Sequence, residues 1–169
     1  MDINTLPLFE PIEKMTYVDI GAQGLVYRLS DRWCVKVPIG RFRHRVEALR
    51  NEAQINDRLY QGGVSVPEPR GFFTFPRSLF PSSHKVYELK GYSFGFVREF
   101  IDGLCYSDLP LDLRDDAKRL HDSEIRKVGG LGVIPRYDYG FDGNNCLYRL
   151  RNKLLDQVVL FDFGFWKRA

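Results

Sequence analysis

The sequence predicts a mixed α+β fold, and three patterns support this class. Short runs rich in β-branched and aromatic residues, separated by glycine or serine–aspartate turns, fill the early part of the chain and return at its end. Two polar segments between them carry apolar residues at helical spacing. The strands come in local groups instead of alternating with helices, which is typical of antiparallel pairing.

The first elements are expected within the first 63 residues. Residues 1–15 contain two prolines and predict an irregular lead-in. Residues 16–37 predict three strands, with a glycine turn after the first and a turn at Ser30–Asp31 before the third. A helix is expected over residues 41–60, where apolar residues recur at helical spacing, and Gly62–Gly63 end it.

The middle of the chain predicts more strands and a second helix. Residues 64–75 read as an extended segment that two prolines interrupt, and residues 76–85 read as a surface loop. Two strands are expected over 85–92 and 93–101. A polar helix is expected over 111–126.

The last part predicts a hairpin that follows a glycine-rich, irregular stretch at 129–145. Its strands are expected over 146–150 and 158–163, joined by a turn around 151–157. The second strand opens with four consecutive apolar residues, so we expect it to be buried on both faces.

Composition limits the class of protein. A chain of 169 residues buries roughly 70% of its unfolded surface, so it needs no metal or disulfide to fold. The three cysteines form no CxxC pair, which argues against zinc and a disulfide framework and favours a reducing, cytoplasmic compartment. The net charge of +3 does not by itself indicate a nucleic-acid partner. No apolar run approaches 18 residues, so no membrane span is expected.

Two glycines and a lysine near the start suggest an anion site. Gly21 and Gly24 flank the first predicted turn, where the missing Cβ leaves backbone N–H groups accessible to an anion. Lys36 lies between two valines on a nearby strand and can reach the same anion. A buried lysine keeps its charge only beside a carboxylate, and Glu52 on the predicted helix is a suitable partner.

A second group of polar residues belongs to the final hairpin. Asp162 follows its apolar strand directly and is well placed to hold a divalent metal on phosphate oxygens. Asn144 and Asn145 precede the partner strand, so we expect them on the same side as Asp162. They would add neutral oxygen ligands.

Taken in order, these segments resemble the protein-kinase-like superfamily. "DIGAQGLVY" resembles the glycine loop through Gly21, Gly24 and Val26, although Asp19 replaces its first glycine. "CVKV" resembles the strand that carries the phosphate-binding lysine, and "EAQINDRL" resembles the helix that carries its glutamate partner. "GFVREFIDG", "RLHDSEI" and "LFDFG" resemble the hinge, the helix before the catalytic loop and the metal-binding segment.

The resemblance implies a role for each matching residue. Lys36 and Glu52 would form the phosphate-binding ion pair, and backbone groups of Glu99 and Ile101 would contact adenine. Asp162 and Asn145, preferred over Asn144, would hold Mg²⁺ beside bound ATP. All these groups would have to meet around one triphosphate.

The catalytic loop departs from the family pattern. The stretch "PRYDYGFDGNN" lacks the family's histidine and its spacing between aspartate and asparagine. Asp138 is the candidate catalytic aspartate, and Asp142 is the alternative.

The implied architecture is an antiparallel N-lobe with one helix over residues 16–102 and a much reduced C-lobe over 103–169. The sequence stops five residues after Gly164, before the helices of a peptide-docking platform, so the resemblance is to a minimal or a C-terminally truncated kinase or pseudokinase. The resemblance implies a kinase that phosphorylates a protein hydroxyl on serine or threonine. The alternatives are a pseudokinase that binds or inhibits a signalling partner, and a small-molecule phosphotransferase.

Overall fold

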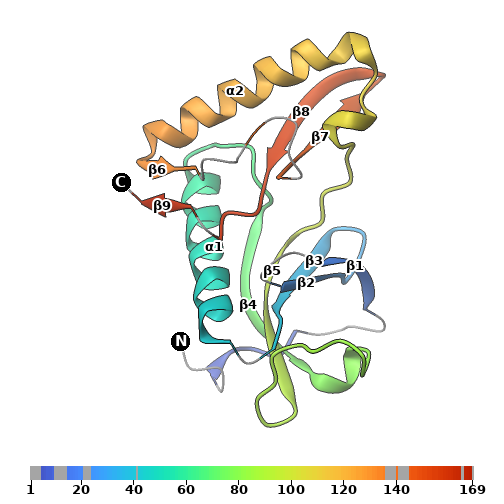
Figure 1. The fold of residues 1–169 in the computed structure, drawn as a ribbon, viewed down its shortest axis with the longest axis vertical. Coiled ribbons are helices and arrows are strands. Elements are labelled where there is room, and N and C mark those ends of the chain that lie inside the picture. Colours follow the sequence, from blue (N-terminus) through green and yellow to red (C-terminus); the bar gives the residue numbers. More distant parts are fainter. Residues whose placement is uncertain are drawn as a thin grey trace. The chain divides into compact units, whose positions relative to one another are not determined.

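The computed structural model describes residues 5–9, 15–20, 24–40, 42–135, 140, 145–164 and 166–168. Across these ranges the chain has an α+β fold with two α-helices and a five-stranded antiparallel sheet (Figure 1), which confirms the predicted class. The contacts divide the chain into two compact units. Met1–Ala53 and Pro69–Phe100 form the first, and Gln54–Glu68 and Ile101–Ala169 form the second.

The first unit is built on the five-stranded sheet, in the order β1-β2-β3-β5-β4. All neighbouring strands are antiparallel, as short local connections favour. The strands are β1 (Thr16–Ile20), β2 (Gly24–Arg28), β3 (Trp33–Pro38), β4 (Pro69–Pro76) and β5 (Tyr92–Glu99). The three strands predicted over residues 16–37 are therefore confirmed.

The segment before β5 differs from the prediction, because residues 85–91 form no strand of the sheet. They make two isolated bridges, from Val86 to Ile39 and from Leu89 to Tyr92. Lys90 and Gly91 turn the chain with φ angles of 51° and 80°. A two-residue turn with positive φ angles closes a tight hairpin. The residues before it are therefore joined to their neighbours by isolated bridges and do not form a sixth strand.

Helix α1 (Arg43–Gln61) covers one face of the sheet with its N-terminal part. Val46, Leu49 and Ala53 pack there against Phe94 and Phe96 of β5. The opposite face carries a separate apolar cluster, which includes Tyr27, Val35, Val37, Phe75 and Val97. Strands β3 and β5 are thus buried on both faces, whereas β1 is exposed. Helix α1 ends before Gly62 and Gly63, as predicted, and Gly63 has φ +73°.

The second unit combines a long helix with a hairpin. Its elements are η3 (Tyr106–Asp108), η4 (Leu111–Leu113), α2 (Arg114–Gly130), β6 (Val133–Ile134), β7 (Cys146–Arg151), β8 (Leu154–Leu160) and β9 (Lys167–Arg168). Helix α2 lies along the β7–β8 hairpin (Figure 1), and its buried side chains share one core with the C-terminal end of α1. The short strands β6 and β9 pair with each other.

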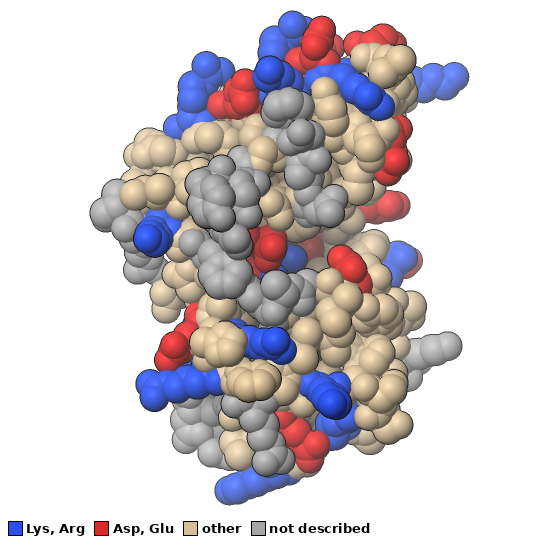
Figure 2. Space-filling view, in the orientation of Figure 1, with Lys and Arg blue, Asp and Glu red and all other residues tan. Residues whose placement is uncertain are grey.

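Helix α2 begins after a turn of 3₁₀ helix and runs four residues beyond the predicted end at 126. Its outer surface carries acidic and basic side chains intermixed, as the upper edge of Figure 2 shows. Glu124 faces inward, where it accepts a hydrogen bond from the backbone N–H of Ser65 at 2.8 Å. The helix is therefore fixed to the segment that follows α1.

The β7–β8 turn is much tighter than the predicted turn over 151–157. Asn152 and Lys153 alone connect the strands, with φ angles of 54° and 65°. Both angles are positive, which is the geometry of a two-residue hairpin turn. The sequence hides it because lysine is an uncommon residue in this conformation.

Candidate functional site

Lys36 is buried on β3, with an exposed fraction of 4%. Side chains alternate along a strand, and Val35 and Val37 enter the apolar cluster on the face of the sheet away from α1. Lys36 points to the other face, where α1 lies. A charged group at this position needs partners in the protein, because burial without them is costly.

The partner of Lys36 is Glu52 of α1, as the sequence predicts. The Lys36 ammonium donates to Oε2 of Glu52 at 2.7 Å, and Glu52 is completely buried. The other carboxylate oxygen accepts a hydrogen bond from Nη1 of Arg98 at 2.9 Å. The cluster of Lys36, Glu52 and Arg98, called the ion cluster below, therefore joins a helix to two neighbouring strands.

Arg98 is the member of the ion cluster that the sequence analysis missed. It occupies β5 opposite Cys34 of β3 and is 6% exposed. The signal was present as a single arginine after the apolar run "FGFV". A charge in such a run calls for a buried partner, yet the sequence alone does not say which carboxylate supplies it.

Cys34 also lies beside the ion cluster, opposite Arg98 on the neighbouring strand. Burial raises the pKa of its thiol, and the charge of Arg98 and a hydrogen bond from Arg98 offset part of that effect. The thiol also donates to the carbonyl oxygen of Glu99 at 3.6 Å. The backbone of Glu99, a predicted adenine contact, thus borders the ion cluster directly, while Ile101 belongs to the second unit.

The structure gives a reason for the missing side chain at Gly24 that differs from the ligand contact suggested by the sequence. A Cβ atom at this position would lie 2.6 Å from the carbonyl oxygen of Val37. The close approach that glycine permits is therefore that of β2 to β3. Val26 pairs with Lys36 across these strands, so its side chain lies on the same face as the ion cluster.

The end of β8 presents Asp162 in an unusual conformation. Its φ angle is 67°, in the left-handed region, and its side chain is exposed. An L-residue other than glycine is strained there by roughly 1–2 kcal/mol. Of the four apolar residues before it that are predicted to be buried, Val158, Val159 and Leu160 are buried, whereas Phe161 is half-buried. Phe163 after it packs edge-to-face against Trp166, with ring centroids 4.8 Å apart. Buried neighbours on both sides hold this aspartate in its strained position.

Asn145 lies beside the segment that carries Asp162. The carbonyl oxygen of Asn145 accepts a hydrogen bond from the backbone N–H of Phe161 at 2.9 Å. The register of β7 and β8 thus sets Asn145 one residue from Asp162 across the hairpin. Four further predicted residues, Gly21, Asp138, Asp142 and Asn144, lie outside the described residues.

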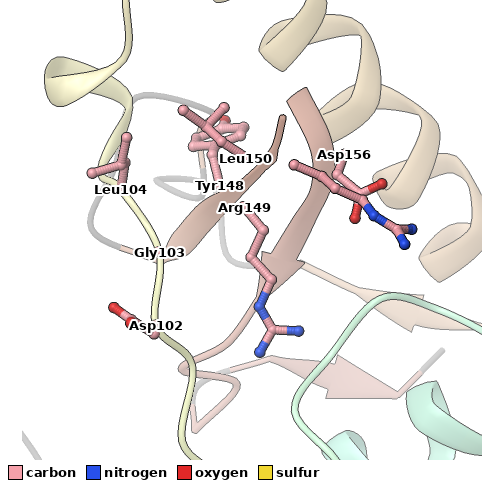
Figure 3. A pocket seen from close by; sticks show the side chains of 8 residues that line it. Asp102, Gly103, Leu104, Tyr148, Arg149, Leu150 and Asp156 are labelled. Carbon is pink, nitrogen blue, oxygen red and sulfur yellow. The ribbon is translucent and has the colours of Figure 1, made fainter. Parts of the chain in front are cut away.

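A hollow of about 480 Å³ in the second unit was not predicted from the sequence. It is lined by Asp102–Leu104 and by the hairpin residues Tyr148–Arg151 and Asp156 (Figure 3). Leu104 bridges to Tyr148 through two backbone hydrogen bonds of 2.9 Å. Carboxylate and guanidinium groups both border the hollow, so its charge favours no single sign of ligand.

Comparison with known proteins assigns no family. No protein-family model matches the chain, and no curated protein matches it. Within the described ranges, no helix has the length and apolar character needed to span a membrane.

Proposed function

We propose that this protein binds ATP with Mg²⁺ through a protein-kinase-like fold and transfers the γ-phosphoryl group to a hydroxyl on a protein. The observation that supports this proposal most directly is the buried ion pair between Lys36 and Glu52. A strand lysine held by a helix glutamate is the arrangement that positions a positive charge for nucleotide phosphates in kinases.

The architecture of the first unit supports the finer fold assignment. It combines a five-stranded antiparallel sheet with one helix that carries Glu52 on its sheet-facing side. This is the composition expected of a kinase-like N-lobe. The second unit, with α2 and the β7–β8 hairpin, would correspond to a reduced C-lobe.

The donors of the second unit fit Mg²⁺. This ion prefers oxygen ligands and is usually held by one or two carboxylates together with substrate phosphates and water. Asp162 offers an exposed carboxylate, and Asn145 offers an amide oxygen from the turn just before β7. No group of three or more His, Cys, Asp or Glu side chains in the described ranges forms a metal cage. When bound, Mg²⁺ would neutralise charge on the phosphate oxygens.

Each protein group has a defined part in the proposed reaction. The Lys36 ammonium binds phosphate oxygens, while Glu52 holds it in place. Glycine-loop residues Gly21 and Gly24 with Val26 cover the nucleotide, and backbone groups of Glu99 and Ile101 contact its adenine. These roles supply orientation and charge stabilisation, which account for most of the catalysis in phosphoryl transfer.

The chemical step is an in-line displacement. The substrate hydroxyl oxygen forms a bond to the γ-phosphorus, while the bond from that phosphorus to the bridging oxygen breaks and ADP leaves. Asp138 is proposed to orient the hydroxyl and to accept its proton, with Asp142 as the alternative. The proposed substrate class is a serine or threonine hydroxyl.

Transfer of radiolabelled γ-phosphate tests the proposal. The purified protein should label itself or a generic protein substrate with Mg-ATP, and Lys36→Ala and Asp162→Ala should each lose at least about 10²-fold in rate. Lys85→Ala and Asp57→Ala are matched controls, because both side chains are exposed and neither has a predicted role. Their rates should equal that of the wild type.

The same proteins distinguish the remaining readings. A thermal shift with Mg-ATP but no transfer by any sample would overturn the kinase activity and favour a nucleotide-binding pseudokinase. No shift at millimolar nucleotide would overturn nucleotide binding itself, because a ligand at a hundredfold excess over Kd stabilises a fold by roughly 2.7 kcal/mol.

A further inference from the structure

Arg98 adds a second cation to the Lys36–Glu52 pair, and its position follows from strand register. Cys34 pairs with Arg98, and Lys36 pairs with Phe96, between β3 and β5. Alternate residues of a strand share a face, so Lys36 and Arg98 project to the same side of the sheet. That side is the one covered by α1.

The Glu52 carboxylate divides its two oxygens between these cations. Oε2 accepts from Lys36 at 2.7 Å and Oε1 accepts from Arg98 at 2.9 Å. The exposed fractions of Lys36, Glu52 and Arg98 are 4%, 0% and 6%. Two cations and one carboxylate give the ion cluster a charge of +1, because arginine does not lose its proton in proteins.

This division matters when Lys36 engages a phosphate. In an ion pair of one lysine and one glutamate, a lysine that turns toward a ligand leaves the negative charge of the buried carboxylate without its partner. This is strongly unfavourable. In the ion cluster Glu52 keeps its hydrogen bond to Arg98, so its charge stays compensated. The ammonium is then available to the ligand at a lower cost.

We propose that Arg98 is a positioning residue of the phosphate site, which holds Glu52 so that Lys36 can bind the phosphate oxygens of a nucleoside triphosphate. The inference rests on the proposed function, since it assigns Lys36 to phosphate. It adds a residue and a mechanism to that site: Arg98 acts through Glu52 and Lys36 and does not itself touch the ligand.

Isothermal titration of the full chain with Mg-ATP tests the inference in a cycle of four proteins: wild type, Arg98→Met, Lys36→Met and the double variant. Arg98→Met should weaken binding about tenfold, within the range for members of one salt-bridge network. Arg98→Lys should recover most of the affinity because it restores a cation beside Glu52. Arg98→Met should have no further effect in the Lys36→Met background, because its effect passes through Lys36.

Each contrary result has its own meaning. Additive effects of the two substitutions would overturn the inference, since they would mean that Arg98 contacts the ligand independently. Wild-type affinity in Arg98→Met would overturn it too, and would leave the proposed function intact. A wild-type protein that binds no Mg-ATP would refute the proposed function and the inference together. If Arg98→Met does not fold, Arg98→Gln carries the same expectation, because it keeps a donor for Glu52 without the charge.

Discussion

The Lys36 ammonium lies 2.7 Å from a carboxylate oxygen of Glu52, although the two residues are 16 positions apart in the sequence. Lys36 belongs to β3 and Glu52 belongs to α1. Both side chains are buried. The ion pair is therefore a tertiary link between β3 and α1.

Glu52→Gln should destabilise the fold by about 3 kcal/mol, because it removes the buried carboxylate charge that Lys36 and Arg98 share. Urea unfolding followed by circular dichroism measures this loss. Glu47→Gln is the control, since Glu47 pairs with Arg43 on the exposed surface of the same helix at 2.8 Å. It should change stability by less than about 0.5 kcal/mol. Equal losses of unfolding free energy in the two variants would mean that the buried ion pair contributes no more to stability than the exposed one.

Tyr27 should make stability depend on alkaline pH. Burial raises the pKa of its phenol from 10.0 to about 12, against a smaller lowering by Arg77, and the hydroxyl is hydrogen-bonded to Nδ1 of His84 at 2.6 Å. The folded protein holds this proton to a higher pH than the unfolded chain. The stabilisation is therefore complete below pH 10 and is lost as the pH rises from 10 to 12.

Chemical unfolding at a series of pH values checks the effect of Tyr27. The free energy of unfolding of the wild type should fall more steeply above pH 10 than that of Tyr27→Phe, which cannot ionise at this position. Equal pH dependence of the unfolding free energy in the two proteins would mean that Tyr27 does not cause the loss of stability above pH 10.

The β7–β8 turn predicts a stabilising substitution. Lys153 has a φ angle of 65°, which costs an L-residue about 1 kcal/mol and costs glycine almost nothing. Lys153→Gly creates the Asn-Gly pair that this turn type prefers, so it should raise the midpoint of thermal unfolding. Lys153→Ala keeps the strain and should give no such gain. A drop in the midpoint for the glycine variant would argue against the left-handed turn.

The sequence predicted those features that depend on local pattern and order. The strands over 16–37 and helix α1 follow from periodicity, and the ion pair follows from a lysine among valines with a glutamate on the next helix. The roles of Asp162 and Asn145 stay predictions, although the hairpin register brings Asn145 beside Phe161.

The features that the sequence did not predict depend on tertiary contacts. The partner of Arg98 is decided by how α1 packs on the sheet, and no spacing rule encodes that choice. The turn at Asn152–Lys153 has no glycine to mark it, so the turn predicted over 151–157 is too wide. The packing need for Gly24 was also not predicted, because it comes from the carbonyl oxygen of Val37 on the neighbouring strand, and the nucleotide role of Gly24 stays a prediction.

The left-handed backbone of Asp162 has a consequence for selection experiments. A glycine at this position would relieve the strain but would remove the carboxylate, so the same change would make the protein more heat-resistant and, on the proposed function, inactive. Directed evolution for robustness alone should drift toward that loss. Libraries built on this chain therefore need a screen that rewards turnover and folding together.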